Sequence, residues 1–182
     1  MRPSEAVAEV LDQLGAHQPQ DPVETVSLLR ITQLLQWLPR PFDEQADPTH
    51  VTGSAIVRDQ RGRFLVHRHK RLGRWLQPGG HLERDELPWE GAVRETNEET
   101  GLQATHPTDG PTLVHLDVHE GPRGHVHLDL RYLLFADSDS PFRPAAGESA
   151  DIDWVAATDA RITDASLISA IRAADRGLLS PR

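Results

Sequence analysis

The spacing of apolar residues changes near residue 50, and this change constrains the fold more than any other feature of the chain. Before it, apolar residues recur every three or four positions, as on one side of a helix. After it, several segments alternate apolar and polar residues, as strands with one covered face do, and helical segments lie between them. We therefore predict an α/β fold, a three-layer α/β/α sandwich around a mixed sheet, with an N-terminal two-helix extension.

The extension is predicted to comprise residues 1–45, before a domain of residues 46–182. Ser4 can cap a first helix, and Asp21 with Pro22 behind it can begin a second helix, which two closely spaced prolines stop. We expect the extension to pack on the domain. The alternative is that the broad apolar face of the second helix forms a dimer contact or a lid over the site.

The remaining segments predict the elements of the domain. Strands are expected at 51–57, 63–69, 112–119, 125–135 and 152–155, and helices at 88–100 and 163–176. A Gly-Pro-Arg-Gly turn makes a hairpin of the third and fourth strands. Residues 70–80 are expected to form a loop, and Gly101 and Gly177 to end the two helices.

Composition excludes several classes of protein. The 182 residues include 28 acidic and 19 basic side chains, for a net charge of −9, and no cysteine. A chain without cysteine has no disulfide framework, thiolate zinc site, iron–sulfur centre or thiol nucleophile, and the negative charge argues against a nucleic-acid polymer as partner. No apolar run approaches a membrane span and residues 1–15 do not resemble a secretion signal, so we expect a cytoplasmic protein without a membrane partner.

Three glutamates on one predicted helix face point to a metal site. Glu95, Glu98 and Glu99 follow the i, i+3, i+4 spacing, so their carboxylates project from the same face and repel one another. They also lie in the C-terminal half of the helix, where the helix dipole disfavours anions. Such a cluster is either a solvated acidic face or a site whose oxygen ligands suit Mg²⁺ or Mn²⁺.

The surrounding segment resembles the signature of the Nudix hydrolases, in particular bacterial MutT-like proteins. The matching positions are Gly80, Glu86, Arg94, Glu95, Glu98, Glu99, Gly101 and Leu102. Thr96 departs from the signature, because the family prefers an apolar side chain there. The resemblance covers about residues 50–175 and says nothing about the N-terminal helices.

This resemblance implies a pyrophosphohydrolase in which water attacks phosphorus and cleaves a nucleoside diphosphate linked to another group. The implied metal ligands are Glu95, Glu98, Glu99 and the backbone carbonyl of Gly79. One of the glutamates would act as base for the water, Arg94 would orient the carboxylates, and Glu86 would brace the loop against the helix. A further carboxylate from a later loop is expected, with Glu148 as the first candidate and Asp151 and Asp153 as weaker ones.

The small nucleotide-type substrate is expected to meet basic, aromatic and imidazole side chains. The candidates for contacts with it are Arg68, Arg71, Trp75, His81 and His127. Trp75 can instead belong to the core. Six of the ten histidines alternate along predicted strands: His67, His69, His115, His119, His125 and His127. The hairpin faces leave three alternatives: a solvated face, a cavity wall that grips phosphate or sugar, and a second, imidazole-rich metal site.

Two functions from different classes fit this sequence: a pyrophosphohydrolase and a binding protein without turnover. A Nudix-fold sensor would bind a nucleotide derivative without turnover, but it has little reason to keep all three glutamates. The diphosphate isomerase branch of the fold uses a catalytic cysteine, which is absent. The substrate stays open between nucleoside diphosphate derivatives and damaged triphosphates, because no marker of a known subfamily is matched.

Overall fold

The computed structural model describes residues 5–179, so Ser4, the expected first cap, lies outside the described residues. The helices are α1 (Glu5–Ala16), α2 (Pro22–Trp37), α3 (Pro88–Thr100), α4 (Ala165–Leu179) and the short 3-10 helix η1 (Pro122–Gly124). The strands are β1 (Thr49–Arg58), β2 (Phe64–Arg68), β3 (Trp75–Leu76), β4 (Gly79–His81), β5 (Thr112–Glu120), β6 (Val126–Phe135) and β7 (Ile152–Val155). None of the described helices has the length and apolarity needed to cross a membrane.

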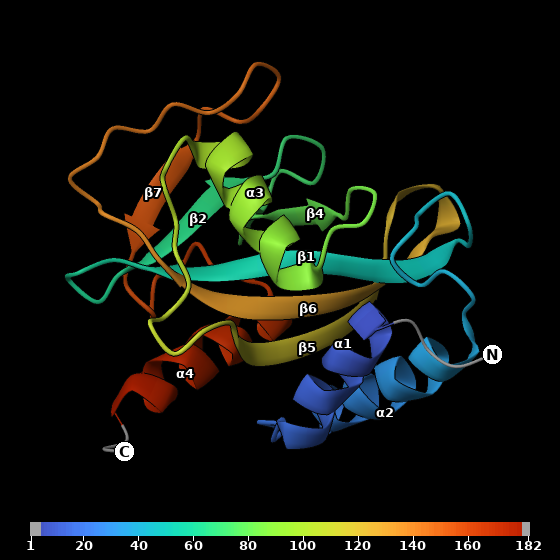
Figure 1. Cartoon of the computed structure of the whole chain (residues 1–182). Coiled ribbons are helices and arrows are strands. Elements are labelled where there is room, and N and C mark those ends of the chain that lie inside the picture. Colours follow the sequence, from blue (N-terminus) through green and yellow to red (C-terminus); the bar gives the residue numbers. More distant parts are fainter. Residues whose placement is uncertain (1–4, 180–182) are drawn as a thin grey trace.

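The seven strands form one mixed sheet. Its central order is β3-β2-β1-β6-β5, while β4 pairs with β1 and β7 pairs with β2. The neighbours β1 and β6 run parallel, and the other pairs are antiparallel. Figure 1 shows α3 above this sheet and α4 below it, with α1 and α2 beside β5. The predicted α/β sandwich with its mixed sheet is confirmed.

Two apolar clusters hold the layers together, one on each side of the sheet. On the α3 side, Val51 and Ala55 of β1 pack with Ala92 of the helix. On the α4 side, Ile56 packs with Ile171. Alternate residues of β1 therefore serve opposite layers, as the period of two in a strand requires.

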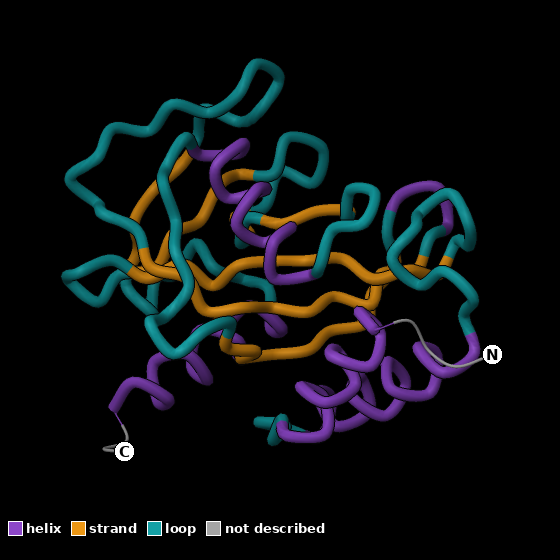
Figure 2. The backbone as a smooth tube through the Cα atoms, viewed as in Figure 1, coloured by secondary structure: helices purple, strands orange, loops and turns teal. Residues whose placement is uncertain are grey.

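The N-terminal helices pack against the sheet rather than standing apart from it (Figure 2). The Asp21 side chain accepts hydrogen bonds from the backbone N–H groups of Val23 and Glu24, each 2.9 Å long, and so begins α2 as predicted. Glu24 is buried and accepts a 3.0 Å hydrogen bond from the backbone N–H of Leu116 in β5. Because Val10 of α1 belongs to the same core as the sheet residues, the helices and the sheet share one hydrophobic interior.

Two sequence predictions were wrong in detail. Residues 70–80 contain β3 and β4, because these short segments pair with β2 and β1, and strands of two or three residues have no visible period. The last helix passes Gly177 and continues to Leu179. A glycine inside a helix costs only about 1 kcal/mol, which the rest of the helix can offset.

The predicted hairpin of β5 and β6 is confirmed, with η1 in the connection. Its register sets His115 opposite Arg131 and His119 opposite His127, so the polar positions of both strands share one sheet face. This face is the α4 side.

Candidate active site

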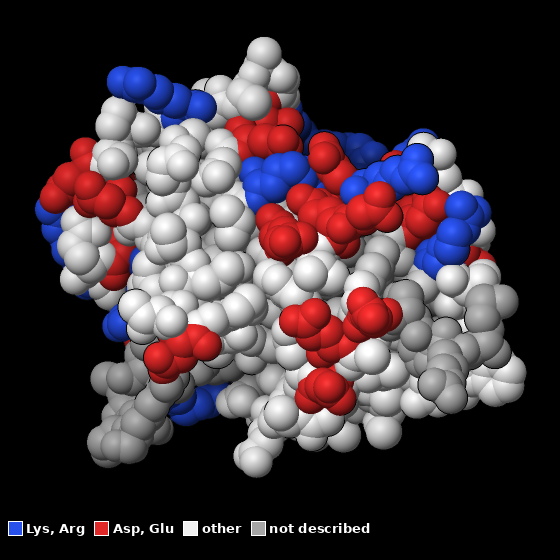
Figure 3. Space-filling model, viewed as in Figure 1, with Lys and Arg blue, Asp and Glu red and all other residues white. Residues whose placement is uncertain are grey.

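Helix α3 presents its glutamates as its sequence pattern predicts. Trp89, Ala92 and Thr96 are buried under the helix, and Gly101 ends it in the left-handed conformation at φ 76°. The Thr96 hydroxyl donates a 2.7 Å hydrogen bond to the backbone carbonyl of Ala92, so this polar residue at an apolar position is satisfied inside the helix. Acidic and basic side chains gather over α3 and its neighbouring loop in Figure 3.

Arg94 joins the carboxylates of this helix to the preceding loop. Its guanidinium donates to Glu95 at 2.9 Å and to Glu98 at 3.2 Å. It also donates two 2.9 Å hydrogen bonds to Glu86 and one of 2.8 Å to the backbone carbonyl of His81. The hydrogen bond to Glu86 raises the pKa of Arg94. Burial would raise the pKa of Glu86, but the contact with Arg94 and the hydrogen bond from the Glu83 backbone N–H together lower it. The loop, β4 and the glutamates are thereby held in one arrangement.

Glu99 is buried without a compensating positive charge. The Gly79 backbone N–H donates a 3.0 Å hydrogen bond to it, and His67 Nε2 lies 3.7 Å from its other oxygen. Burial raises the pKa of Glu99 to about 8, and the charges of nearby glutamates add to this effect. Burial and the nearby His69 lower the pKa of His67 to about 4, so the imidazole is neutral at pH 7. A divalent cation is the partner that such a carboxylate lacks.

Glu95 lies against the backbone of β4. A Cβ on Gly80 would lie 2.5 Å from Glu95 Oε1, so a side chain there would displace this carboxylate. Burial raises the pKa of Glu95 in spite of the opposing charge of Arg94. Two crowded carboxylates that resist ionisation offer the oxygen ligands that Mg²⁺ and Mn²⁺ prefer.

A cavity of about 310 Å³ opens beside Glu99. It is lined by His67, His69, Lys70, Arg71, Glu99, Glu148 and Ser149. It brings together two sequence candidates, Glu148 and Arg71, with the helix glutamate. The weaker carboxylate candidates have other partners: Asp153 pairs with Arg161 at 2.9 Å, and Asp151 lies 3.8 Å from Arg68.

Two other predicted contacts, Arg68 and Trp75, are not among the residues that line this cavity. Arg68 Nε donates to the backbone carbonyl of Gly73 at 3.3 Å. The Arg161 guanidinium lies 5.1 Å from the centre of the Trp75 ring, which packs against the α4 core. His67 was not among the sequence candidates for the site, although its alternation with His69 directly before the basic loop was a signal that could have identified it.

His81 and His127 lie on the α4 face of the sheet, with their Nε2 atoms 3.2 Å apart. Burial and the adjacent imidazoles of His119, His81 and His50 lower the pKa of His127 to about 4. These two candidates therefore belong to a separate histidine cluster. His50 was missed, because only the parallel pairing of β1 with β6 sets it opposite His127.

The interpretation of the hairpin's polar face as solvated is wrong for its central residues. Asp129 is 1% exposed and Arg131 is 3% exposed. Asp129 accepts hydrogen bonds from Thr52 at 3.0 Å, Ser54 at 2.7 Å and Arg131 at 2.8 Å. Helix α4 covers this network, since Arg131 also donates to Ser166 at 2.7 Å.

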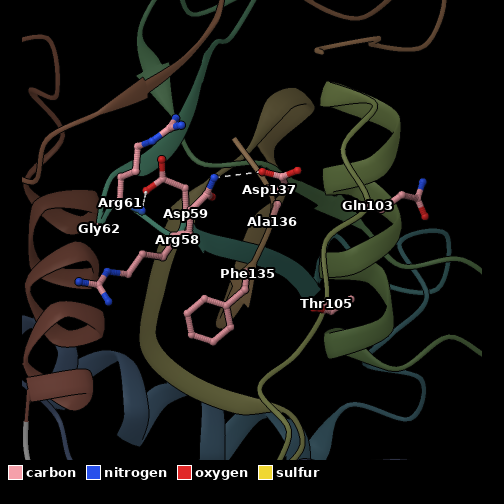
Figure 4. A pocket seen from close by; sticks show the side chains of 10 residues that line it. Arg58, Asp59, Arg61, Gly62, Gln103, Thr105, Phe135, Ala136 and Asp137 are labelled. Atoms are coloured by element: carbon pink, nitrogen blue, oxygen red, sulfur yellow. Dashed lines mark hydrogen bonds between the residues drawn. The ribbon is translucent and has the colours of Figure 1, made fainter. Parts of the chain in front are cut away.

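A wider depression of about 900 Å³ lies around the β1–β2 turn and residues 103–105 (Figure 4). Its described lining includes none of the α3 glutamates. Gln60 donates a 3.0 Å hydrogen bond to Asp137 across it, and Arg61 pairs with Asp139 at 2.6 Å. Because Asp137, Arg61 and Asp139 already have partners, we regard the glutamate face and not this depression as the candidate active site.

The sheet, the glutamate helix and the glycine approach define the class of protein. The NUDIX domain profile matches residues 48–174, and the chain belongs to the Nudix family. Among solved structures, a NUDIX-family hydrolase from Clostridium perfringens is 28% identical, with a TM-score of 0.61 over 72% of this chain and 98% of that one.

Curated relatives match a shorter stretch. A MutT-like protein of Streptomyces ambofaciens is 38% identical over 71 residues, which are 38% of this chain and 46% of that protein. Phosphatase NudJ of Escherichia coli is 47% identical over 57 residues, 30% of this chain and 37% of NudJ. The chain thus matches less than half the length of these relatives. A UDP-X diphosphatase structure, at 16% identity and a TM-score of 0.56, shares the fold over 94% of this chain and 93% of that one.

Proposed function

We propose that the chain is a divalent-metal-dependent pyrophosphohydrolase that cleaves the diphosphate bond of a nucleoside diphosphate linked to another group, by attack of water on phosphorus. The observation that carries this proposal is the buried, uncompensated carboxylate of Glu99, which shares its helix face with Glu95 and Glu98. Membership of a family of hydrolases supports it. The proposed setting is the cytoplasm, with Mg²⁺ or Mn²⁺ as the ion.

Each residue of the glutamate face has a proposed role. The carboxylates of Glu95, Glu98 and Glu99 and the carbonyl of Gly79 would hold the metal, and Glu148 across the cavity would add a further carboxylate. When bound, such a metal spreads the charge that develops on the phosphate and lowers the pKa of its water. One glutamate of the face takes the proton from the attacking water.

Arg94 and Glu86 are proposed as positioning residues. The guanidinium holds Glu95 and Glu98 by hydrogen bonds, and Glu86 fixes the guanidinium in turn. Arg71, on the cavity wall, is proposed to contact the substrate phosphates. Arg68 and Trp75, from the same region, are proposed to contact the rest of the substrate.

A Nudix-fold sensor that binds a nucleotide derivative without turnover is the alternative. The decisive experiment measures product release from a panel of nucleoside diphosphate derivatives and triphosphates, with Mg²⁺, with Mn²⁺ and with chelator. We expect metal-dependent cleavage of one compound class. Binding seen as thermal stabilisation, without product from the same compound, would instead identify a sensor.

Glu99→Gln tests the role of the glutamate face in this assay. We expect turnover to fall by about 10²–10³-fold, because a ligand of the charge-stabilising metal is lost. Glu90→Gln is the matched control, since Glu90 is an exposed glutamate of the same helix. Near-normal turnover in Glu99→Gln would disprove the assignment of Glu99 as a ligand.

We also propose that residues 46–182 form the hydrolase domain and that residues 1–45 extend it.

Two copies of the chain are proposed to meet through α2. The outward side of α2 exposes four large apolar residues by 64–78%: Val23, Val26, Leu29 and Trp37. Light scattering of the wild type and of Leu29→Glu tests the contact. A dimer that Leu29→Glu separates is expected, and a wild-type monomer would contradict the proposal.

A further inference from the structure

Four histidines meet on the α4 face of the sheet, away from the glutamate face. His50 lies in β1, His81 in β4, His127 in β6 and His125 directly before β6. One ring nitrogen from each of the four lies within 4.8 Å of the others. The sheet register produces this meeting, because His50 is opposite His127, and Thr52, two residues further on, is opposite His81.

In two of the rings, Nδ1 lies beside an oxygen outside the cluster, which leaves Nε2 for the cluster. His50 is fully buried, and its Nδ1 donates a 3.0 Å hydrogen bond to the carbonyl of Asp47, while its Nε2 has no partner. His81 Nδ1 lies 3.1 Å from a carboxylate oxygen of Glu44. A carbonyl or carboxylate behind the ring is the arrangement that orients histidines on metals. The Nδ1 of His125 is likewise buried without a partner.

One nitrogen pair of the cluster already has the separation that a small tetrahedral ion requires, and all four nitrogens lie within 4.8 Å of one another. With zinc–nitrogen bonds of about 2.0–2.1 Å, the nitrogens of a tetrahedral site lie about 3.3 Å apart. The Nε2 atoms of His81 and His127 are 3.2 Å apart. His119 is near His127, with ring centres 5.3 Å apart, but it is not among the four histidines whose nitrogens lie within 4.8 Å of one another.

We propose that His50, His81, His125 and His127 bind one Zn²⁺ ion through four imidazole nitrogens, in a closed structural site with Glu44 and the Asp47 carbonyl behind the ligands. Imidazole donors select zinc and related transition metals, whereas the all-oxygen glutamate face selects Mg²⁺ or Mn²⁺. The chain thus carries two metal sites of different chemistry on opposite faces of its sheet.

The zinc site connects three parts of the chain. It ties the linker around residue 47 and the start of β1 to β4 and to the tip of the hairpin. The backbone carbonyl of His81 accepts a hydrogen bond from Arg94, so the strand held by zinc also holds the arginine that orients the glutamates. The ion acts here by fixing β4 and takes no part in a reaction.

Zinc content tests the proposal without an activity assay. Chelator-stripped full-length protein is titrated with Zn²⁺ against a chromophoric chelator, and Co²⁺ serves as a probe whose visible absorption reports four-coordinate binding. We expect one tight site per chain in the wild type. The site should persist in a variant that combines Glu95→Gln, Glu98→Gln and Glu99→Gln, because that change removes the other metal site.

Variants of the cluster should weaken this binding selectively. We expect His127→Asn to weaken it by more than about 100-fold and Glu44→Gln by about 10-fold. His106→Gln is the matched control, since His106 is a half-buried histidine that contacts the Trp89 carbonyl at 3.1 Å, and it should bind zinc like the wild type.

Circular dichroism of the stripped proteins shows whether His127→Asn keeps the fold. If it does not, His125→Gln provides the same test, because His125 is only half-buried. Equal zinc affinity in the cluster variants and the wild type would overturn the proposal. The proposal would also be overturned if the triple glutamate variant lost the tight zinc site while the histidine variants kept it. Neither result depends on turnover, so the proposed hydrolase activity stands or falls separately.

Discussion

Both faces of the sheet bury ionisable side chains, and they compensate them differently. On the α4 face, burial alone would raise the pKa of Asp117, but the hydrogen bond from His119 and the charge of Arg131 lower it to about 2. On the α3 face, burial raises the pKa of Glu99 to about 8, because the Gly79 N–H is its one hydrogen-bond donor among the described residues. Asp117 on one face is thus paired with a cation, whereas Glu99 on the other face is not.

This difference separates charges that support the fold from charges that serve a ligand. A paired and hydrogen-bonded network such as Asp117, Asp129 and Arg131 is complete within the chain. An unpaired carboxylate such as Glu99 costs stability until a cation arrives, which is typical of functional sites. The histidine cluster resembles Glu99 in this respect, because His50 keeps a buried nitrogen without a partner.

The largest expected effect on stability is on the paired face. Arg131→Met removes the cation that pairs with the buried Asp129 and the half-buried Asp117, so we expect a loss of about 3–5 kcal/mol in the free energy of unfolding. Urea denaturation measures it. Arg61→Met, which breaks the exposed pair with Asp139, is the control and should cost less than about 1 kcal/mol. A similar small loss for Arg131→Met would remove the distinction between the faces.

In metal-free protein, Glu99→Gln should increase the free energy of unfolding, whereas Arg131→Met should decrease it. The pKa of Glu99 is about 8 in the folded chain against an ordinary 4.5, so the proton it retains stabilises the fold below pH 4.5, and this contribution is lost as pH rises through 8. At pH 9 we expect the variant to be about 2–4 kcal/mol more stable than the wild type. Excess Mg²⁺ should reverse the order, because only the wild type keeps its full ligand set.

Thermal unfolding of both proteins from pH 5 to pH 9, in chelator, gives this comparison. Glu98→Gln is the control, because the Glu98 side chain is 51% exposed and its removal should change little. If the stability of the wild type does not fall relative to that of Glu99→Gln as pH rises, the charge of Glu99 must be compensated by other groups of the protein.

Asp117→Asn tests the paired carboxylate itself. The pKa of Asp117 is lowered from 3.8 to about 2, so its contribution is present above pH 3.8 and is lost as pH falls through 2. We expect the variant to be about 2 kcal/mol less stable than the wild type at pH 7, with the gap closing in acid. Denaturant titrations at pH 7 and pH 2.5 measure it, and an equal gap at both pH values would argue against the ionic origin.

The smallest effect is expected at Thr96, a buried polar residue of the α3 face. Its hydroxyl bonds to the Ala92 carbonyl of its own helix, so Thr96→Val should change the free energy of unfolding by less than about 1 kcal/mol. Thermal unfolding checks this value. A large change in stability would mean that the α3 face is sensitive to any change of a buried polar group, and not specifically to an unpaired charge.

Local patterns determined much of this protein. The caps and period of 88–100 predict α3 within its observed bounds, and the spacing of Glu95, Glu98 and Glu99 places them on one face. The alternation of 112–119 and 125–135 predicts the hairpin. These features depend on neighbours a few residues apart, so a single sequence contains them.

Contacts between distant segments were decided by the tertiary structure alone. The parallel register of β1 and β6 brings Thr52 to Asp129, 77 residues away, and by the same pairing places His50 in the histidine cluster. Pairing with β1 also makes a strand of Gly79–His81, where sequence indicated a loop. Whether a carboxylate is paired, as Asp129 is, or unpaired, as Glu99 is, depends on which side chains the fold brings beside it, because burial and charge act through space and not along the chain.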